Sequence, residues 1–366
     1  MPSAREHLER LAARPRPAGS PAEREARDWC RASLAACGFA VAAEPFAYSA
    51  LPGRWATPAL GVVGVAAVCI AARLAWNGRP GAAAIVLAAV GAGAAAGGAW
   101  LARVAVTWLP WGRQDGINLV ATRGPGASPH LWLAAHLDSK SQPVPILLRA
   151  AGVTALLAVW LAALVAAALQ VALGAAPALW PWLAGAAIVA GLPVAASIVG
   201  ARSPGALDNA SGASAVLRAA ELAAPGVPLG ILLTSAEELG LAGARAWVRG
   251  RSRTPAAAIN VDGVDDTGPL TVTYTGRRPA PLLAQLAAAG GLQPMRISRL
   301  VPGILTDAVA LTDAGWRAVT VSKGTWRTVA RIHTPNDNLG RLRGDGAEAV
   351  ARWLAQVVTT AHTVET

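Results

Sequence analysis

Two long stretches of this chain carry almost no charge, and they constrain its fold more than any other feature. They span residues 56–103 and 146–201, and each contains two apolar runs. About 20 apolar residues are enough to cross a lipid bilayer as a helix. Core helices of this length in soluble proteins usually keep one polar face, which these runs lack. We therefore predict two transmembrane hairpins, with four transmembrane helices, rather than buried alanine-rich helices of a large soluble core.

The rest of the chain has the pattern of an ordinary globular domain. It comprises residues 1–50, 113–142 and 204–366, where charged and apolar residues are mixed. From residue 205 onward, strand-like runs alternate with helix-like segments. This alternation indicates a largely parallel sheet with helices on both faces. We predict a mixed α/β domain, formed by these three segments, into which the two hairpins are inserted.

The charge and cysteine content exclude several classes of protein. The formal net charge is +11, but the cations are mostly isolated arginines rather than a basic cluster interleaved with aromatic residues, so no nucleic-acid partner is expected. The three cysteines, Cys30, Cys37 and Cys69, form no disulfide framework and no CxxC motif. The opening MPSAREHLER is charged and has no apolar run behind it, so we expect no cleavable signal peptide.

The distribution of arginines predicts how the chain is oriented in a lipid bilayer. On the side of the globular domain, the apolar segments are flanked by Arg54, Arg103, Arg113, Arg149 and Arg202. The far side offers Arg73 and Arg79 in the first hairpin and no cation in the turn of the second. Positive charge concentrates on the cytoplasmic side of membrane proteins. We therefore expect a multi-pass protein of the cell membrane whose globular domain is cytoplasmic.

Acids and histidines recur where strand-like runs end or helix-like runs begin, which is where α/β proteins place their chemistry. They occur in five motifs: His136-Leu137-Asp138, Asp208-Asn209-Ala210-Ser211-Gly212, Glu237-Glu238, Asp262 and His333-Thr334-Pro335. Each motif alone has a simpler interpretation, such as a helix cap, a turn or a loop. Together they supply what two zinc ions need: imidazole and carboxylate ligands, one carboxylate that can bridge, and a separate base.

In order and position, these motifs resemble those of the M28 family of zinc aminopeptidases. The resemblance covers about residues 1–50, 113–142 and 204–340, and Arg16-Pro17-Ala18-Gly19-Ser20 is similar to the opening of that family. It implies a zinc metallopeptidase that binds two Zn²⁺ per chain and removes residues from a peptide substrate with a free N-terminus. Because of the apolar segments, we expect this enzyme to be embedded in a membrane.

The resemblance also implies a role for each motif residue. The implied metal ligands are His136 and Asp262 for the first zinc, Glu238 and His333 for the second, and Asp208 as the bridge. Glu237 would be the general base that activates the water between the two metals. Asp138 would hold the imidazole of His136 in the correct tautomer.

Some features depart from the family pattern and leave alternatives open. The second hairpin separates His136 from Asp208, and Ala308 follows Asp307 where relatives carry a histidine. Ile304 lies near the place of a tyrosine in some relatives, so the residue that stabilises the oxyanion is unassigned. The alternatives are an amidohydrolase or carboxypeptidase-like zinc hydrolase, and a non-catalytic membrane receptor on a peptidase fold. A glutaminyl-cyclase-like enzyme is less expected, because those relatives use one zinc and need neither His136 nor Asp262.

Overall fold

The chain forms two compact units. The computed structural model describes residues 2–124, 129–174, 178–249, 251, 256–290, 294–301 and 303–365, with side chains as far as residue 361. Unit 1 comprises Met1–Ala50, Thr107–Ser141 and Ala201–Thr366. Unit 2 comprises Leu51–Val106 and Gln142–Gly200. Unit 1 is therefore assembled from three segments that are far apart in the sequence.

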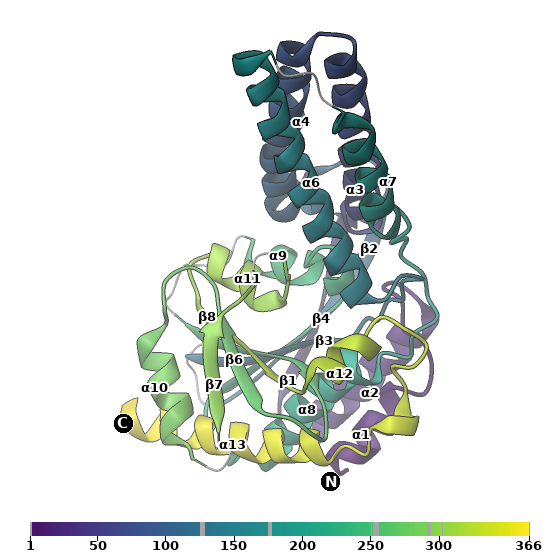
Figure 1. The fold of residues 1–366 in the computed structure, drawn as a ribbon. Coiled ribbons are helices and arrows are strands. Elements are labelled where there is room, and N and C mark those ends of the chain that lie inside the picture. The colour runs from purple at the N-terminus through teal and green to yellow at the C-terminus, as the bar shows by residue number, and fades with distance from the viewer. Residues whose placement is uncertain are drawn as a thin grey trace. The chain divides into compact units, whose positions relative to one another are not determined.

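A mixed eight-stranded sheet forms the centre of unit 1, in the order β1-β2-β4-β3-β5-β8-β6-β7 (Figure 1). The strands are β1 (Ala40–Ser49), β2 (Arg113–Arg123), β3 (Leu131–His136), β4 (Leu229–Thr234), β5 (Ala257–Val264), β6 (Leu270–Tyr274), β7 (Met295–Arg299) and β8 (Arg317–Lys323). The central strands β4, β3, β5 and β8 run parallel to one another, whereas β1, β2 and β6 form antiparallel pairs. The predicted mixed, largely parallel α/β fold is confirmed.

The helices of unit 1 cover both faces of this sheet. They are α1 (Ala4–Leu11), α2 (Pro21–Ala36), α8 (Gly212–Leu222), α9 (Ala242–Val248), α10 (Ala280–Ala288), α11 (Asp307–Asp313), α12 (Trp326–Arg331) and α13 (Asp345–Glu365), with short helical turns η2 (Ala206–Ser211), η3 (Glu237–Leu239) and η4 (Leu339–Arg341). Alternate residues of β3 enter two different cores. Leu133 and Ala135 pack in the core with α1, α2, α8, α10 and α13, and Trp132 and Ala134 pack in the core with α9 and α11.

The register of the central strands brings their carboxyl ends to one edge of the sheet. His136, the last residue of β3, pairs with Thr234 at the end of β4. Two positions earlier, Ala134 pairs with Asn260 of β5, which places Asp262 beside the same edge. Parallel strands covered on both faces present their ligand sites at this edge. The residues that follow β3, β4 and β5 therefore converge on one place.

Unit 2 is built from long apolar helices: α3 (Leu51–Trp76), α4 (Pro80–Trp100) continued by η1 (Leu101–Ala105) and α5 (Val106–Trp108), α6 (Ile146–Leu173) and α7 (Trp180–Ala195). Three helices in the described part of the chain are long and apolar enough to cross a membrane: Leu51–Trp76, Pro80–Trp108 and Ile146–Leu173. The prediction of four such helices is not met, since α7 has 16 residues. It begins with Pro181 in its first turn and ends two residues beyond Pro193, because proline favours helix starts and disrupts helix interiors.

Small residues and one polar side chain hold these helices together. A Cβ added to Gly61 of α3 would lie 2.5 Å from the backbone nitrogen of Ala195, and one added to Gly191 of α7 would lie 2.1 Å from Val65. Gln170 of α6 donates from Nε2 to the carbonyl of Ala75 at 3.0 Å and accepts from Trp180 Nε1 at 2.9 Å. Close glycine contacts and interhelical hydrogen bonds are typical of helices that associate in lipid.

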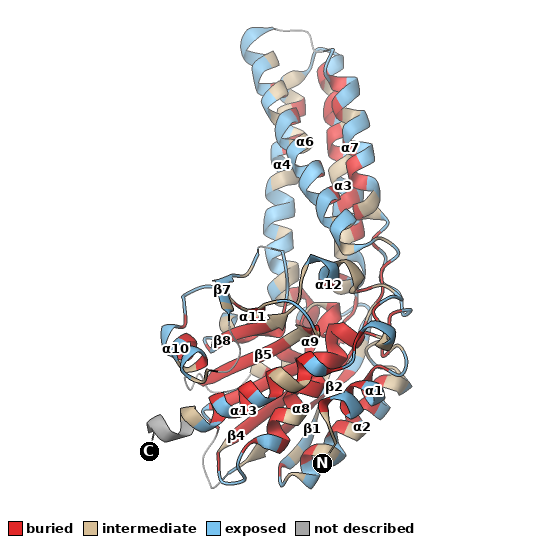
Figure 2. Ribbon diagram, turned by 60° about the horizontal axis from the view of Figure 1, so that its bottom comes forward, coloured by how far each residue is buried: buried red, intermediate tan, exposed pale blue. Residues whose placement is uncertain are grey.

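The outward surfaces of these helices are apolar. Large apolar side chains are exposed on each of them, among them Val62, Ile85, Val165, Leu169 and Val189, and Figure 2 marks much of α4 and α6 as exposed. So many exposed large apolar side chains on neighbouring helices are unusual for a soluble monomer. The buried core of unit 2 consists mostly of alanine.

Candidate metal centre

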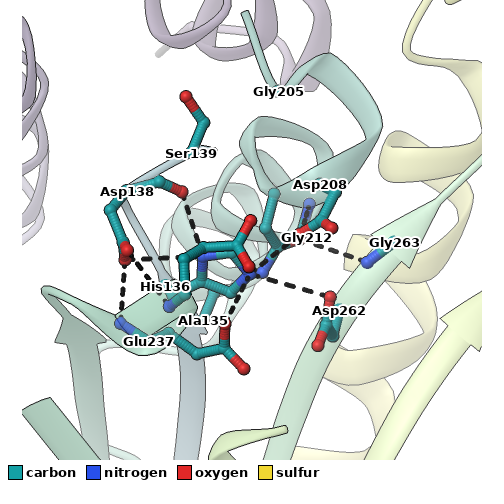
Figure 3. Close-up of polar contacts among 12 residues, drawn as sticks. Ala135, His136, Asp138, Ser139, Gly205, Asp208, Gly212, Glu237, Asp262 and Gly263 are labelled. Carbon is teal, nitrogen blue, oxygen red and sulfur yellow. Dashed lines mark hydrogen bonds and ion pairs between the residues drawn. The ribbon is translucent and has the colours of Figure 1, made fainter. Parts of the chain in front are cut away.

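The structure brings together all seven residues that the sequence singled out (Figure 3 shows five of them). They are His136 and Asp138 at the end of β3, Asp208 in η2, Glu237 and Glu238 in η3 after β4, Asp262 in β5 and His333 after α12. All lie at the carboxyl edge of the central strands. Two groups of three ligand atoms result, and within each group the atoms lie within 4.8 Å of one another.

The first group consists of His136, Asp208 and Asp262. His136 Nε2 lies 3.1 Å from Asp208 Oδ1 and 3.8 Å from Asp262 Oδ1. Glu237 Oε2 approaches the same nitrogen at 3.9 Å. One imidazole nitrogen therefore faces three separate carboxylates in a space that the protein almost wholly encloses.

The second group consists of Asp208, Glu238 and His333. His333 Nε2 lies 2.9 Å from Asp208 Oδ2 and 3.3 Å from Glu238 Oε1. Asp208 is common to both groups and presents Oδ1 to the first and Oδ2 to the second. This arrangement suits a carboxylate that bridges two cations.

The backbone at two of these positions adopts a conformation that non-glycine residues rarely use. Ala236, just before the glutamate pair, has φ of 56°, and His333 has φ of 61°. Such strain is typical of functional sites, where the surrounding structure maintains it. The turn at Ala236 also lets adjacent glutamates face different partners, Glu237 toward His136 and Glu238 toward His333.

Asp138 contacts both the imidazole of His136 and the glutamate pair. Its carboxylate accepts the backbone N–H of Glu237 at 3.1 Å and that of Glu238 at 3.2 Å. His136 Nδ1 lies 3.1 Å from the backbone carbonyl of Asp138 and 3.6 Å from its carboxylate. A neutral His136 that donates from Nδ1 to that carbonyl turns the lone pair of Nε2 into the site. Asp138 therefore orients both glutamates with its side chain and the imidazole mainly with its backbone.

Three further residues support the centre, none of which the sequence assigned as a metal ligand or as the base. Lys140 Nζ lies 2.6 Å from Glu238 Oε2. Asp337 accepts the N–H groups of Leu207 and Asp208, and Asp307 accepts a short hydrogen bond from Thr234 Oγ1. A cation two residues after the His136-Leu137-Asp138 motif was the sequence signal that could have pointed to Lys140.

Burial and mutual charge strongly perturb the acids of the site. Burial raises the pKa of Glu237 well above its ordinary value, and the neighbouring Glu238, Asp307 and Asp262 add to the rise although His136 opposes it. For Glu238, burial alone would raise the pKa, but the Lys140 ammonium and His333 lower it to about 2. The pKa values of the two adjacent glutamates are thus shifted in opposite directions, which is typical of sites that perform acid–base chemistry.

The donor set fits metal cations. Buried carboxylates are stable only when they are paired or bind metals, and here Asp208, Glu237, Glu238 and Asp262 crowd into one enclosed space. Among the described residues, buried atoms without a hydrogen bond include His136 Nε2 and Glu238 Oε1, both of which face the centre. Histidine nitrogen and carboxylate oxygen are ligands that zinc prefers. The residues present therefore form two groups, each of which could hold a metal cation such as zinc.

Solved structures with a similar fold include an aminopeptidase, a zinc aminopeptidase and a glutaminyl cyclase. The aminopeptidase from Aneurinibacillus sp. strain AM-1 is 16% identical, with a TM-score of 0.55 over 98% of this chain and 93% of that chain. BSAP, a zinc aminopeptidase from Bacillus subtilis, is 15% identical, with a TM-score of 0.56 over 98% and 94%. The glutaminyl cyclase of Fimbriiglobus ruber is 14% identical, with a TM-score of 0.55 over 98% and 94%. At these identities the similarity establishes the fold.

The sequence itself matches a known family. The model of peptidase family M28 matches residues 192–358, which include Asp208, Glu237, Glu238, Asp262 and His333. The predicted resemblance to the M28 family is therefore confirmed. The search of curated proteins found no match. The family match supports a hydrolase whose substrate is a peptide.

Proposed function

We propose that this chain is a membrane-embedded dinuclear zinc aminopeptidase, with unit 1 as its catalytic domain. One observation carries the proposal: the two carboxylate oxygens of Asp208 face two separate groups of ligands, each completed by one histidine and one further acid. His136 and Asp262 would hold one zinc, Glu238 and His333 the other, and Asp208 both. When bound, the two ions would polarise the scissile carbonyl and supply a nucleophilic water at neutral pH.

Glu237 is the residue best placed to move the proton. It belongs to neither ligand group, yet its Oε2 lies 3.9 Å from His136 Nε2. The N–H bond to Asp138 fixes the backbone of Glu237. A buried carboxylate with a raised pKa can accept a proton from the attacking water and return it to the departing amine. Asp138 would contribute by holding Glu237 and Glu238 in these two directions.

Glutaminyl cyclisation is the second candidate, favoured by the similarity in fold to the cyclase of Fimbriiglobus ruber. We prefer peptide hydrolysis because both ligand groups are complete, whereas a one-zinc cyclase has no need of His136 and Asp262. The amidohydrolase or carboxypeptidase-like alternative is separated from an aminopeptidase by whether the substrate needs a free α-amine.

Unit 2 supports attachment to a lipid bilayer. Three of its helices have the length and apolar character of membrane spans, and their exposed surfaces carry valine, leucine and isoleucine. The shorter α7 packs against α3 and α6. We infer that unit 2 is the membrane anchor and that the enzyme acts on peptides that reach the membrane surface.

The test uses the full chain purified in detergent. Metal content is measured by mass spectrometry, with two zinc ions per chain expected. The protein is then incubated with three matched peptides: one with a free N-terminus, its N-acetylated form and one that begins with glutamine. Release of the first residue from the free peptide but not from its N-acetylated form supports the proposal. Loss of ammonia from the glutamine peptide without cleavage would establish cyclisation, and cleavage of the acetylated peptide would establish another hydrolase.

A further inference from the structure

The long insertion between two of the proposed metal ligands poses a structural problem. One segment of unit 1 ends at Ser141 and the next begins at Ala201, and the helices α6 and α7 lie between these residues in the sequence. His136 precedes the insertion and Asp208 follows it, yet their side chains meet at 3.1 Å. The packing of α6 on α7 returns the chain close to its point of departure, and contacts within unit 1 then fix the two ends to each other.

Hydrogen bonds join the two ends of the insertion directly. Ser139 Oγ donates to the carbonyl of Ser203 at 3.0 Å. The N–H of Arg202 donates to Ser141 Oγ at 2.8 Å. Both bonds lie within unit 1 and connect the segment after β3 with the segment before η2. They bring the departing and returning chains side by side.

Arg16 reinforces this junction from a third part of the chain. Its Nε donates to the carbonyl of Leu137 at 2.9 Å, its Nη1 to that of Pro204 at 2.6 Å and its Nη2 to that of Gly205 at 3.2 Å. The backbone of Arg16 also exchanges two hydrogen bonds with Ser139, each of 2.9 Å. One side chain therefore binds the residue after His136 and the two residues that open the turn to Asp208.

The chemistry of this contact requires arginine. Arg16 is 2% exposed, and although burial lowers the pKa of its guanidinium to about 10, the group keeps its charge at neutral pH. Only a guanidinium offers five N–H donors in a planar fork that can reach carbonyls in two directions. A buried cation bound to carbonyls is costly unless those bonds form, so its presence maintains the junction.

We propose that Arg16 is a positioning residue, the clamp that sets His136 against Asp208 and isolates their geometry from the inserted helices. The inference rests on the proposed function, because it takes these two residues as metal ligands. It adds that the insertion is tolerated because Arg16, Ser139 and Ser141 close its base. A structural change in the inserted helices α6 and α7 then leaves the positions of His136 and Asp208 unchanged.

The experiment measures zinc affinity of the full chain in detergent by competition with a chromogenic chelator. Arg16→Met removes the donors but keeps the bulk, and Arg16→Lys is the matched variant that keeps the charge. A Gly-Ser-Gly-Ser insert is placed between Pro143 and Val144, on the helix side of the clamp, in each background. With Arg16 present, we expect the insert to change zinc affinity by less than about twofold. In the R16M background, the same insert should lower it about tenfold further.

The difference between the effects of the insert on zinc affinity in the two backgrounds tests the clamp. A purely structural role for Arg16 would lower the apparent Tm in chelator and leave the effect of the insert the same in both backgrounds, which would overturn the clamp. In the R16K background, the insert should also lower zinc affinity more than it does in the wild type, but by less than in R16M. This variant provides the test if R16M does not fold. An insert that lowers zinc affinity equally in R16K and in the wild type would then contradict the clamp. A wild-type chain that binds no zinc would refute the proposed function instead, since the clamp is judged only by affinities in a zinc-binding chain.

Discussion

Asp208 and Glu237 illustrate how identical functional groups acquire different tasks from their surroundings. Asp208 shares its two oxygens between His136 and His333, whose hydrogen bonds outweigh burial and lower its pKa well below the ordinary range. Among the described residues, no hydrogen-bond donor reaches the Glu237 carboxylate, and burial raises its pKa. The first is therefore suited to stay an anionic ligand and the second to exchange a proton.

The clearest consequence at the residue scale concerns Glu237. Glu237→Gln keeps the shape and the backbone bond to Asp138 but removes the proton acceptor, so peptide release should fall by at least about 10²-fold. Zinc content should stay as in the wild type. Glu238→Gln is the matched control, because loss of a ligand should lower zinc content first. Unchanged turnover in Glu237→Gln would remove this residue from the base role.

Lys140 gives a second prediction. Its ammonium lies 2.6 Å from Glu238 Oε2 and would repel a cation held by this glutamate. Lys140→Met should raise the affinity of the second zinc by about tenfold, whereas Lys140→Arg, which keeps the charge, should not. Stepwise zinc titration in the presence of a chelator measures both constants. A weaker second site in Lys140→Met would mean that Lys140 serves mainly to orient Glu238.

Glu23 makes the stability of unit 1 depend on pH. It is buried, accepts bonds from Ser235 Oγ and the N–H of Gly19, and burial raises its pKa to about 7. The folded state therefore holds this proton more tightly than the unfolded chain, and the stabilisation present at low pH is lost as pH rises from about 4.5 to about 7. The loss is on the order of 3 kcal/mol.

Glu23→Gln cannot ionise and should escape this loss. The apparent Tm is measured by thermal scanning in detergent with a chelator present. The difference between the Tm of the variant and that of the wild type should increase in favour of the variant from pH 5 to pH 8. Surface Glu9→Gln serves as the control. Parallel pH profiles for Glu23→Gln and the wild type would show that Glu23 does not titrate in this window.

At the scale of elements, the helices of unit 2 are held by a few specific contacts. Alanine predominates in their core, and lipid-facing helices gain no hydrophobic drive from association. Close approach at Gly61 and Gly191 and the hydrogen bonds of Gln170 are therefore the contacts that select the arrangement. Gln170 reaches the end of α3 and the start of α7 from α6, so it connects three helices at once.

Gln170→Leu tests this contact. Removal of both hydrogen bonds should destabilise the association of these helices by about 1 kcal/mol. The measurement is the apparent Tm of the full chain in mild detergent, compared with Thr154→Ala, which removes a bond within α6 alone. Equal effects of the two substitutions would show that Gln170 contributes no interhelical stabilisation.

At the scale of the whole molecule, two compact units share one chain that passes between them repeatedly. Both parts of unit 2 leave and re-enter unit 1. The first insertion lies between β1 and β2, which pair with each other, and the second lies between β3 and η2. Neither insertion interrupts a strand, so the helical hairpins leave the sheet intact. An anchored enzyme of this design would have its centre at a fixed side of the membrane.

The orientation is tested by cysteine labelling in intact cells. The excess of arginine beside unit 1 favours a cytoplasmic position of that unit. After Cys37 and Cys69 are replaced by serine, Gly78→Cys in the exposed turn between α3 and α4 should react with an impermeant maleimide. Arg278→Cys, exposed on unit 1, should react only after permeabilisation. The reverse pattern would place the peptidase outside the cell.

The sequence by itself determined the local features of this protein. Apolar runs, strand–helix alternation and the order of acids and histidines all reside in short windows, because hydrophobic periodicity and side-chain chemistry are local properties. They predicted the mixed sheet, the family and the residues that meet in the centre. The fourth apolar run was the exception: prolines near both ends of α7 shorten it to 16 residues.

Only the tertiary structure decided which of these groups face one another. The carboxylate of Asp138 accepts the N–H groups of Glu237 and Glu238, Lys140 pairs with Glu238, and Arg16 joins both ends of the second insertion. Such contacts link residues about a hundred or more positions apart or depend on how a loop turns at Ala236. Geometry of this kind follows from packing and backbone conformation rather than from sequence pattern, so it emerges only when the chain is folded.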